Sequence, residues 1–244
     1  MKSITTKTTI SYFQILKKAI TLLRINPTKI IAITAIVAIP GSILRVAQLD
    51  TTTNASLLST FSGMFLIVSL TWAFLNEKDL SKRSFANIYV ISSSRILPFI
   101  ATTILVSLIG IQLVVGAYLV VLSMSGLFPF VVNVAGIIII LISLYLLLRL
   151  SLSMILVVGN DITSIGSLKL SWKLTKGNLL RLLFAWVAIL LTVIIIGWVF
   201  LYFINLIPVI SSNSIVSALC DGIILTIVTP ILISYEVELT KSLQ

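Results

Sequence analysis

The chain of 244 residues contains no histidine, one cysteine and only seven acidic residues. Histidine is the commonest general base and metal ligand, so its absence excludes a Ser-His-Asp triad and an HExxH zinc site. The single thiol, Cys220, can form neither an internal disulfide nor a thiolate metal cluster. The glycines form no GxGxxG or GxxxxGK[ST] phosphate-binding loop. We therefore expect no metal, no cofactor and no enzymatic activity.

Charged residues of either sign are scarce, whereas apolar residues are abundant. Hydrophobic residues make up 59% of the chain, charged residues 10%, and the mean hydropathy is +1.20. Soluble domains average about 45–50% apolar and about 25% charged residues. This composition excludes a soluble globular domain, a disordered tail and a disulfide scaffold. It predicts an all-α, polytopic integral membrane protein.

Six apolar stretches are long enough to cross a bilayer, whose hydrocarbon core of about 30 Å takes about 20 helical residues. The six predicted spans are residues 30–49, 57–75, 96–122, 128–148, 179–203 and 215–235. Residues 152–158 are also apolar, so the sequence does not define where the fourth span ends. We expect one membrane domain over residues 1–244, in which 1–29 form a retained amphipathic N-terminal segment, 30–235 a six-helix bundle and 236–244 a cytoplasmic tail.

The basic residues predict the orientation of these spans. All Lys and Arg residues except Arg45 fall in the segments on one side of the six spans, and the positive-inside rule makes that side cytoplasmic. Both termini are then cytoplasmic, and we expect a multi-pass protein of the cell membrane. This topology accounts for the net charge of +10 without a nucleic-acid partner. The expected partners are the bilayer, with anionic headgroups at the basic face, and a membrane-protein partner or a second copy of the chain.

Residues 10–24 have apolar side chains at helical spacing and a basic opposite face, which predicts an amphipathic helix in the headgroup plane with its apolar side toward lipid. Asn26-Pro27 ends it, because a residue before proline disfavours the helical conformation. A similar pattern recurs 152 residues later and a weaker one 66 residues later. The aligned residues are Leu16, Lys17, Leu22, Arg24, Asn26 and Lys29 with Leu168, Lys169, Leu174, Lys176, Asn178 and Arg181, and Lys17, Leu22 and Lys29 with Arg83, Ile88 and Arg95.

Two interpretations of this recurrence remain open. The first is a threefold repeat of an interfacial helix followed by a transmembrane hairpin. The second is that basic amphipathic segments entering a membrane resemble one another without common descent.

A short motif lies in the third amphipathic segment. It comprises Ser171, Trp172, Lys173, Leu174, Thr175, Lys176, Gly177 and Asn178, and it follows Arg149 at the end of a span and Asp161 about a dozen residues on. This arrangement resembles the glycerophosphoryl diester phosphodiesterase membrane-domain family over about residues 149–190. The resemblance implies a multi-helix membrane module. The phosphodiesterase chemistry of the fused members lies in a separate soluble domain, which this chain lacks.

The motif has two physical interpretations. In the functional one, Trp172 lies in the interface while Lys173 and Lys176 reach headgroup phosphates, so the motif is a lipid or partner docking surface. In the structural one, Gly177 adopts a left-handed conformation that ends one helix, and Asn178 caps the next. The structural interpretation is the simpler of the two.

Two pairs of opposite charge are candidate sites. Arg45 and Asp221 lie at similar depth near the outer ends of the first and sixth spans, and we expect them to pair or to share a vestibule. The pair either holds the terminal helices together or serves as a gate or a proton or cation site. Arg149 and Asp161 form a second candidate pair at the cytoplasmic edge, where snorkelling to headgroups is the alternative.

The favoured function is a non-enzymatic membrane module with an accessory, scaffolding or lipid-interacting role. The alternative is a small transporter or permease subunit whose polar site involves Asp221 and Arg45. A transporter should have a polar cavity that reaches the middle of the membrane. A scaffold should have a closed helical bundle with a conspicuous interfacial surface.

The substitution Asp221→Asn separates the two roles of the outer pair. If the pair is structural, the substitution leaves Arg45 without a counter-charge, at a cost of about 2.5–3.5 kcal/mol, and lowers the amount of folded protein in the membrane. Quantifying the folded protein by gel filtration of detergent extracts measures this. Normal folding together with lost function would support a site instead.

Overall fold

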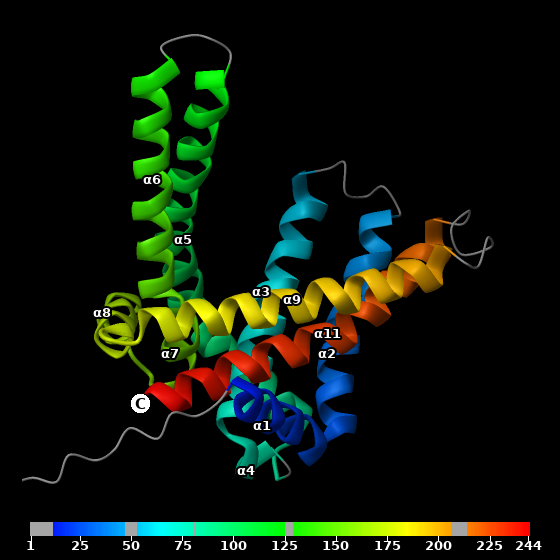
Figure 1. Ribbon diagram of the computed structural model, residues 1–244. Coiled ribbons are helices and arrows are strands. Elements are labelled where there is room, and N and C mark those ends of the chain that lie inside the picture. The colour runs from blue at the N-terminus through cyan, green and yellow to red at the C-terminus, as the bar shows by residue number, and fades with distance from the viewer. Residues whose placement is uncertain (1–11, 47–52, 81, 125–128, 206–213) are drawn as a thin grey trace, which may run out of the picture. The chain divides into compact units, whose positions relative to one another are not determined.

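The computed structural model describes residues 12–46, 53–80, 82–124, 129–205 and 214–244, and every regular element in these ranges is a helix (Figure 1). The predicted all-α class is therefore confirmed for the described residues. The chain divides into two compact units. Unit 1 comprises Met1–Arg83 and Ala185–Gln244, and unit 2 comprises Ser84–Phe184. Helix α9 (Leu179–Asn205) begins in unit 2 and continues in unit 1.

Each of the six predicted spans overlaps a different helix. By length and apolarity, the described residues contain four helical segments able to cross a membrane, or five if one sharply bent pair counts as a single span. The four segments are Phe85–Ser123, Phe130–Gly159, Leu179–Val199 and Gly222–Leu243. The second predicted span is not among these segments, because only Thr60–Leu75 of its helix is fully described and this part is too short to cross a membrane. The structure is that of a multi-pass membrane protein with four or five candidate spans.

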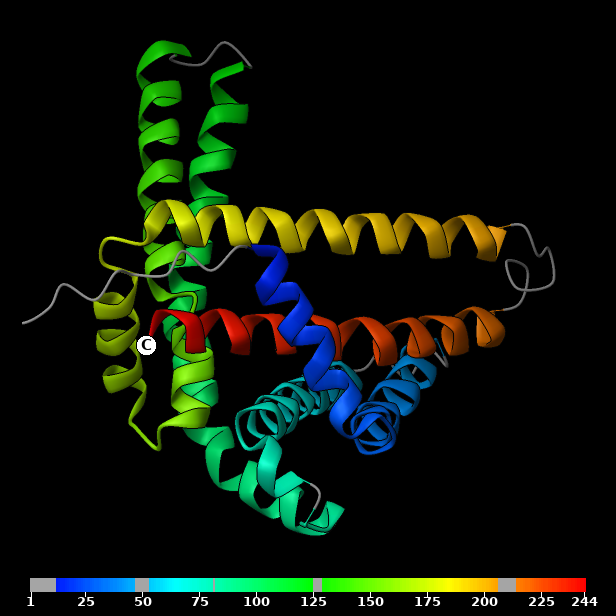
Figure 2. The same ribbon diagram turned by 60° about the horizontal axis from the view of Figure 1, so that its bottom comes forward.

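In unit 1, the long C-terminal helix packs against three others. Helix α11 (Ser214–Leu243) contacts α1 (Tyr12–Ile25), α2 (Pro27–Val46) and α3 (Thr53–Leu75), and Figure 2 shows α1 in blue beside α11 in red. Apolar side chains that are completely buried line these contacts, among them Ile33, Leu70 and Val237. The segment predicted as a C-terminal tail continues α11 as far as Leu243.

A bend of 87° separates α1 from α2 at the predicted break. Pro27 is the first residue of α2. The N–H of a first helical residue has no acceptor within the helix, so a proline loses no hydrogen bond at this position. The carbonyl of Asn26 accepts the first helical hydrogen bond of α2, from Ile30 N at 3.1 Å. The Asn-Pro pair therefore ends one helix and starts the next, as expected from the sequence.

The apolar residues of α1 divide between the protein interior and the surface. Ile15, Ala19 and Leu22 are buried, whereas Ile20, on the side predicted to face lipid, is 41% exposed. The buried residues pack against protein, because α1 contacts α11 more extensively than any other helix, and contact of the exposed residues with lipid stays a prediction. Helical periodicity predicts which face is buried, but it does not identify what covers that face.

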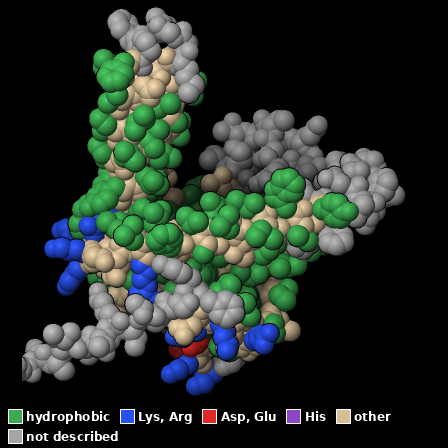
Figure 3. All heavy atoms as spheres, viewed as in Figure 1, with side chains coloured by type: hydrophobic (Ala, Val, Ile, Leu, Met, Phe, Trp, Pro, Cys, Tyr) green, Lys and Arg blue, Asp and Glu red, His purple; other side chains and the backbone are tan. Residues whose placement is uncertain are grey.

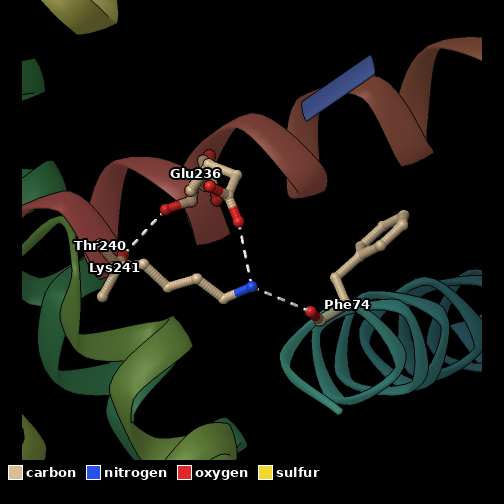
Figure 4. Close-up of polar contacts among 5 residues, drawn as sticks. Phe74, Glu236, Thr240 and Lys241 are labelled. Atoms are coloured by element: carbon tan, nitrogen blue, oxygen red, sulfur yellow. Dashed lines mark hydrogen bonds and ion pairs between the residues drawn. The ribbon is translucent and has the colours of Figure 1, made fainter. Parts of the chain in front are cut away.

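Two lysines cap helix ends in unit 1. Lys241 of α11 donates from Nζ to the carbonyl oxygen of Phe74 at 3.4 Å, near the C-terminal end of α3 (Figure 4). Lys29 of α2 donates to the carbonyl of Leu80 at 2.9 Å, at the end of the short helix α4 (Glu77–Leu80). The last carbonyls of a helix have no partner within it and carry partial negative charge, so an ammonium group stabilises them.

In unit 2, helices α5 (Phe85–Met124) and α6 (Pro129–Leu150) form an antiparallel hairpin. Their backbones approach closely at Gly116 and Gly136, where a Cβ added to Gly136 would lie 2.8 Å from the carbonyl oxygen of Gly116. The outer surface of the hairpin is apolar, as the green side chains in Figure 3 show. Exposed members of this surface include Val114, Tyr118, Val121, Val131 and Leu141.

Two short helices follow α6 in unit 2. Helix α7 (Ser153–Gly159) is largely buried, and α8 (Ser164–Thr175) starts at Thr163, whose side chain accepts a hydrogen bond from Gly166 N at 3.2 Å. Both helices pack against α5, and α8 also contacts α6. Residues 152–158, which made the end of the fourth predicted span ambiguous, thus belong mostly to the buried helix α7, which follows α6 after a turn.

The middle amphipathic segment is not a separate helix. Ile88 and Arg95 both belong to α5, which runs without interruption into the predicted span. The positions equivalent to Asn26-Pro27 are Ser92 and Ser93, and their hydroxyls donate to carbonyls of their own helix at 2.7 Å. Because serine can satisfy its hydroxyl in this way, nothing at these positions interrupts the helix.

The glycine contact predicts a sharp difference between two substitutions in the hairpin. Gly136→Ala places a methyl group against backbone atoms of α5 and should lower the free energy of unfolding by about 1–3 kcal/mol. Gly110→Ala has nothing within 4 Å of the added Cβ and should be neutral or stabilising by up to about 1 kcal/mol. Unfolding in a denaturing detergent, followed by circular dichroism, measures both. Equal stability of the two variants would contradict the packing described.

Candidate functional site: an arginine between two aromatic rings

The candidate site lies at the end of α6 and is formed entirely by unit 2. Arg149 is the penultimate residue of α6, and Tyr145 lies one turn earlier on the same helix. Helix α8 adds Trp172, whose ring is almost perpendicular to that of Tyr145, at 86° and 6.1 Å between centroids. The guanidinium carbon of Arg149 lies 5.3 Å from the centroid of Tyr145 and 5.0 Å from that of Trp172. The cation therefore contacts both rings.

Hydroxyl groups satisfy the backbone at this helix end. The last four carbonyls of α6 have no partner within the helix, and in apolar surroundings an unsatisfied carbonyl is costly. Ser171 Oγ donates to the carbonyl oxygen of Arg149 at 2.7 Å, and Thr175 Oγ1 lies 3.3 Å from the same oxygen. Ser151 and Ser153 donate to the carbonyls of residues 148 and 150. Ser171 and Thr175 of the motif thus join α8 to the end of α6.

The guanidinium makes its hydrogen bonds with the same two aromatic residues. Nε and Nη2 of Arg149 donate to the phenolic oxygen of Tyr145 at 3.1 and 3.0 Å. Nη1 donates to the backbone carbonyl of Trp172 at 3.3 Å. Arg149 retains only 9% of its surface, whereas both aromatic residues are 41% exposed. The site is therefore a largely buried cation with partly exposed aromatic walls.

The expected ion pair between Arg149 and Asp161 does not form. Asp161 pairs with Arg95 of α5 instead. Helix α7 lies between Arg149 and Asp161 in the chain and carries the carboxylate away from the end of α6. A further bond, from Ser164 Oγ to the carbonyl of Pro98 at 2.9 Å, fixes the start of α8 to α5 next to this ion pair.

The exposed surface of α8 is basic. Lys169 and Lys173 of this helix and Lys176 directly after it are exposed, together with Trp172. Figure 3 shows Lys and Arg side chains gathered where α8 lies, next to the apolar surface of the hairpin. Unit 2 contains six basic residues and one acidic residue, so this surface attracts anions.

Gly177 and Asn178 form the turn between α8 and α9. Gly177 has a φ of +80°, the left-handed conformation expected of it. Asn178 directly precedes α9, and its carbonyl accepts from Leu182 N at 2.9 Å. Its side-chain amide donates to the carbonyl of Leu174 at 3.3 Å, so it also satisfies the end of α8.

The side chains of Arg45 and Asp221, the predicted outer pair, lie outside the described residues, although their backbones belong to α2 and α11. Tyr145 was not predicted from the sequence. Its position four residues before Arg149 is the signal that could have found it, because residues at this spacing are neighbours on a helix.

Comparison of the chain with models of known protein families, with curated proteins and with solved structures found no match.

The hydroxyl contacts predict that Ser171→Ala destabilises the protein. The substitution removes the strongest hydrogen bond to the buried Arg149 carbonyl and should cost about 1–3 kcal/mol. Ser94→Ala is the control, because the Ser94 hydroxyl is exposed and bonds only a carbonyl of its own helix, so its removal should cost less than about 0.5 kcal/mol. Denaturing-detergent titration compares the two. A Ser171→Ala variant no weaker than the control would show that this bond does not stabilise the end of α6.

Proposed function

We propose that this protein is a non-enzymatic integral membrane module that interacts with anionic lipid through the basic surface of α8. The observation that carries the proposal is the position of this surface within unit 2. Lys169, Lys173 and Lys176 are exposed next to a hairpin whose outer surface is apolar. A chain that presents both surfaces in one compact unit suits the boundary between hydrocarbon and headgroups.

The two surfaces have complementary partners in a bilayer. The apolar surface of the hairpin is more stable against acyl chains than against water, because exposure of apolar groups to water is unfavourable. Tryptophan favours the interfacial region, which fits the half-exposed ring of Trp172. Each lysine near an anionic membrane surface contributes about 1 kcal/mol of attraction. Lipid binding is therefore the function best supported by the composition of this unit.

The proposed topology has six spans, with both termini on the cytoplasmic side of the cell membrane. The distribution of basic residues supports it, as does the coincidence of each predicted span with a separate helix. A repeat of an interfacial helix followed by a hairpin fits the order α1, α2, α3 and the order α8, α9, α11. In the central copy, α5 would combine both helical parts in one.

We also propose that the chain is related to the glycerophosphoryl diester phosphodiesterase membrane-domain family. The residues that carry the resemblance lie together in the structure, since Arg149 contacts Ser171, Trp172 and Thr175. A motif whose members are in mutual contact has a physical reason to persist as a unit.

The double substitution Lys173→Gln with Lys176→Gln tests the lipid-binding surface. The purified full-length protein in neutral detergent is titrated with dioctanoyl phosphatidylglycerol, and bound lipid is counted by native mass spectrometry. Loss of two lysines should weaken binding about five- to thirtyfold at low salt and less at high salt.

Lys78→Gln with Lys82→Gln is the matched control, because it removes two exposed lysines from unit 1 and should change binding less than about twofold. Equal binding of phosphatidylglycerol and phosphatidylcholine by the unaltered protein would contradict the proposal.

A further inference from the structure

We propose that Arg149 is the centre of a specific site for one phosphate group, supplied by the phosphodiester headgroup of an anionic lipid. This inference rests on the proposed lipid-binding function and deepens it. The proposed function requires only a basic surface, whereas the site requires a particular side chain that is largely buried. Three features of Arg149 support the site: its unused donors, its missing counter-charge and the exposure of the aromatic rings beside it.

The guanidinium retains hydrogen-bonding capacity. An arginine side chain has five N–H donors, one on Nε and two on each terminal nitrogen. Nε, Nη1 and Nη2 each make one hydrogen bond in the described structure, to Tyr145 or to the Trp172 carbonyl. One N–H on each terminal nitrogen therefore has no acceptor among the described residues of unit 2. Two donors on one planar group suit a phosphate, whose oxygens accept such pairs.

The charge of Arg149 also lacks an acidic partner within its unit. Asp161 is the single acidic residue of unit 2, and it pairs with Arg95. Burying a cation is unfavourable, and cation–π contacts compensate only part of that cost. The rings orient the guanidinium and compensate part of this cost. A bound anion would compensate the rest.

The cluster around Arg149 reaches the surface of unit 2. Arg149 keeps 9% of its surface exposed, and Tyr145 and Trp172 beside it each keep 41%. The carbonyl of Arg149 is held by α8, which fixes the base of the side chain while its tip contacts both rings. A site with a preformed orientation loses less entropy on binding than a flexible surface lysine does.

The chemistry favours a lipid phosphate over a dissolved one. Arg149 is the penultimate residue of α6, which forms most of the segment Phe130–Gly159 that is long and apolar enough to cross a membrane, and it lies next to the apolar surface of the hairpin. A lipid can place its acyl chains on that surface and its phosphate at the helix end, whereas inorganic phosphate contacts the cation alone. The same guanidinium would bind either, so the experiment includes both.

The test compares Arg149→Gln with the lysine double variant in the same titration. Full-length protein in neutral detergent is titrated with dioctanoyl phosphatidylglycerol and, separately, with inorganic phosphate. Arg149→Gln should weaken lipid binding about a hundredfold or more, beyond the loss expected for the lysine double variant, because it removes a charge-assisted pair of hydrogen bonds. Inorganic phosphate at high concentration should displace the lipid from the unaltered protein and have no effect on what little binds to the variant.

Arg149→Lys keeps the charge but not the planar fork, and it carries the test if Arg149→Gln does not fold. Its affinity for the lipid should lie between those of the unaltered protein and the glutamine variant. Circular dichroism and gel filtration verify that each variant is folded.

Three results would overturn the site. Unchanged lipid binding in both folded Arg149 variants would exclude it. A loss in the lysine double variant as large as that in Arg149→Gln would indicate diffuse surface attraction, which leaves the proposed function intact and removes the specific site. Binding of inorganic phosphate without binding of the lipid would overturn the assignment to a headgroup. If the unaltered protein shows no preference for anionic lipid, the proposed function fails as well.

Discussion

The backbone at the end of α6 imposes the constraint on which the rest of unit 2 depends. A helix that leaves an apolar environment must find partners for its last carbonyls before water can supply them. Here α8 supplies a partner through Ser171, which donates to the carbonyl of Arg149, with Thr175 beside it. Because that bond requires α8 to lie against α6, it also brings the ring of Trp172 to the guanidinium. The polar cluster is thus a consequence of how the helix ends.

Unit 1 satisfies the same requirement with longer side chains. Lys241 reaches from α11 to the end of α3, and Lys29 reaches from α2 to the end of α4. Lys241 is also paired with Glu238 at 3.0 Å, so its charge is compensated within its own helix. The contrast with Arg149 is informative. At the end of α3 the capping group is a cation with a carboxylate beside it, whereas at the end of α6 neutral hydroxyls do the capping and Arg149 makes no ion pair among the described residues of unit 2.

The sequence predicts the helices well because their signals are local. Each apolar stretch coincides with a helix, Asn26-Pro27 marks the bend after α1, and Gly177 has the left-handed conformation expected after α8. The central amphipathic segment joins the following span in one helix, because no proline or glycine marks an end at Ser92 and Ser93 and both serines are compatible with a continuing helix. The choice of partners was less predictable. Asp161 pairs with a residue 66 positions earlier, and no local pattern specifies that pairing.

The contacts of Arg149 explain why an arginine suits this position better than a lysine would. Its Nε and Nη2 donate to the phenolic oxygen of Tyr145 and its Nη1 to the Trp172 carbonyl, so three nitrogens define the plane of the guanidinium. A lysine ammonium has no such plane and could not contact both rings and the carbonyl with a fixed orientation. The arrangement therefore couples the position of α8 to the orientation of the cation. A ligand that binds the guanidinium in this orientation would bind more tightly when α8 is packed against α6. By thermodynamic linkage, the bound ligand would then stabilise the packed position of α8.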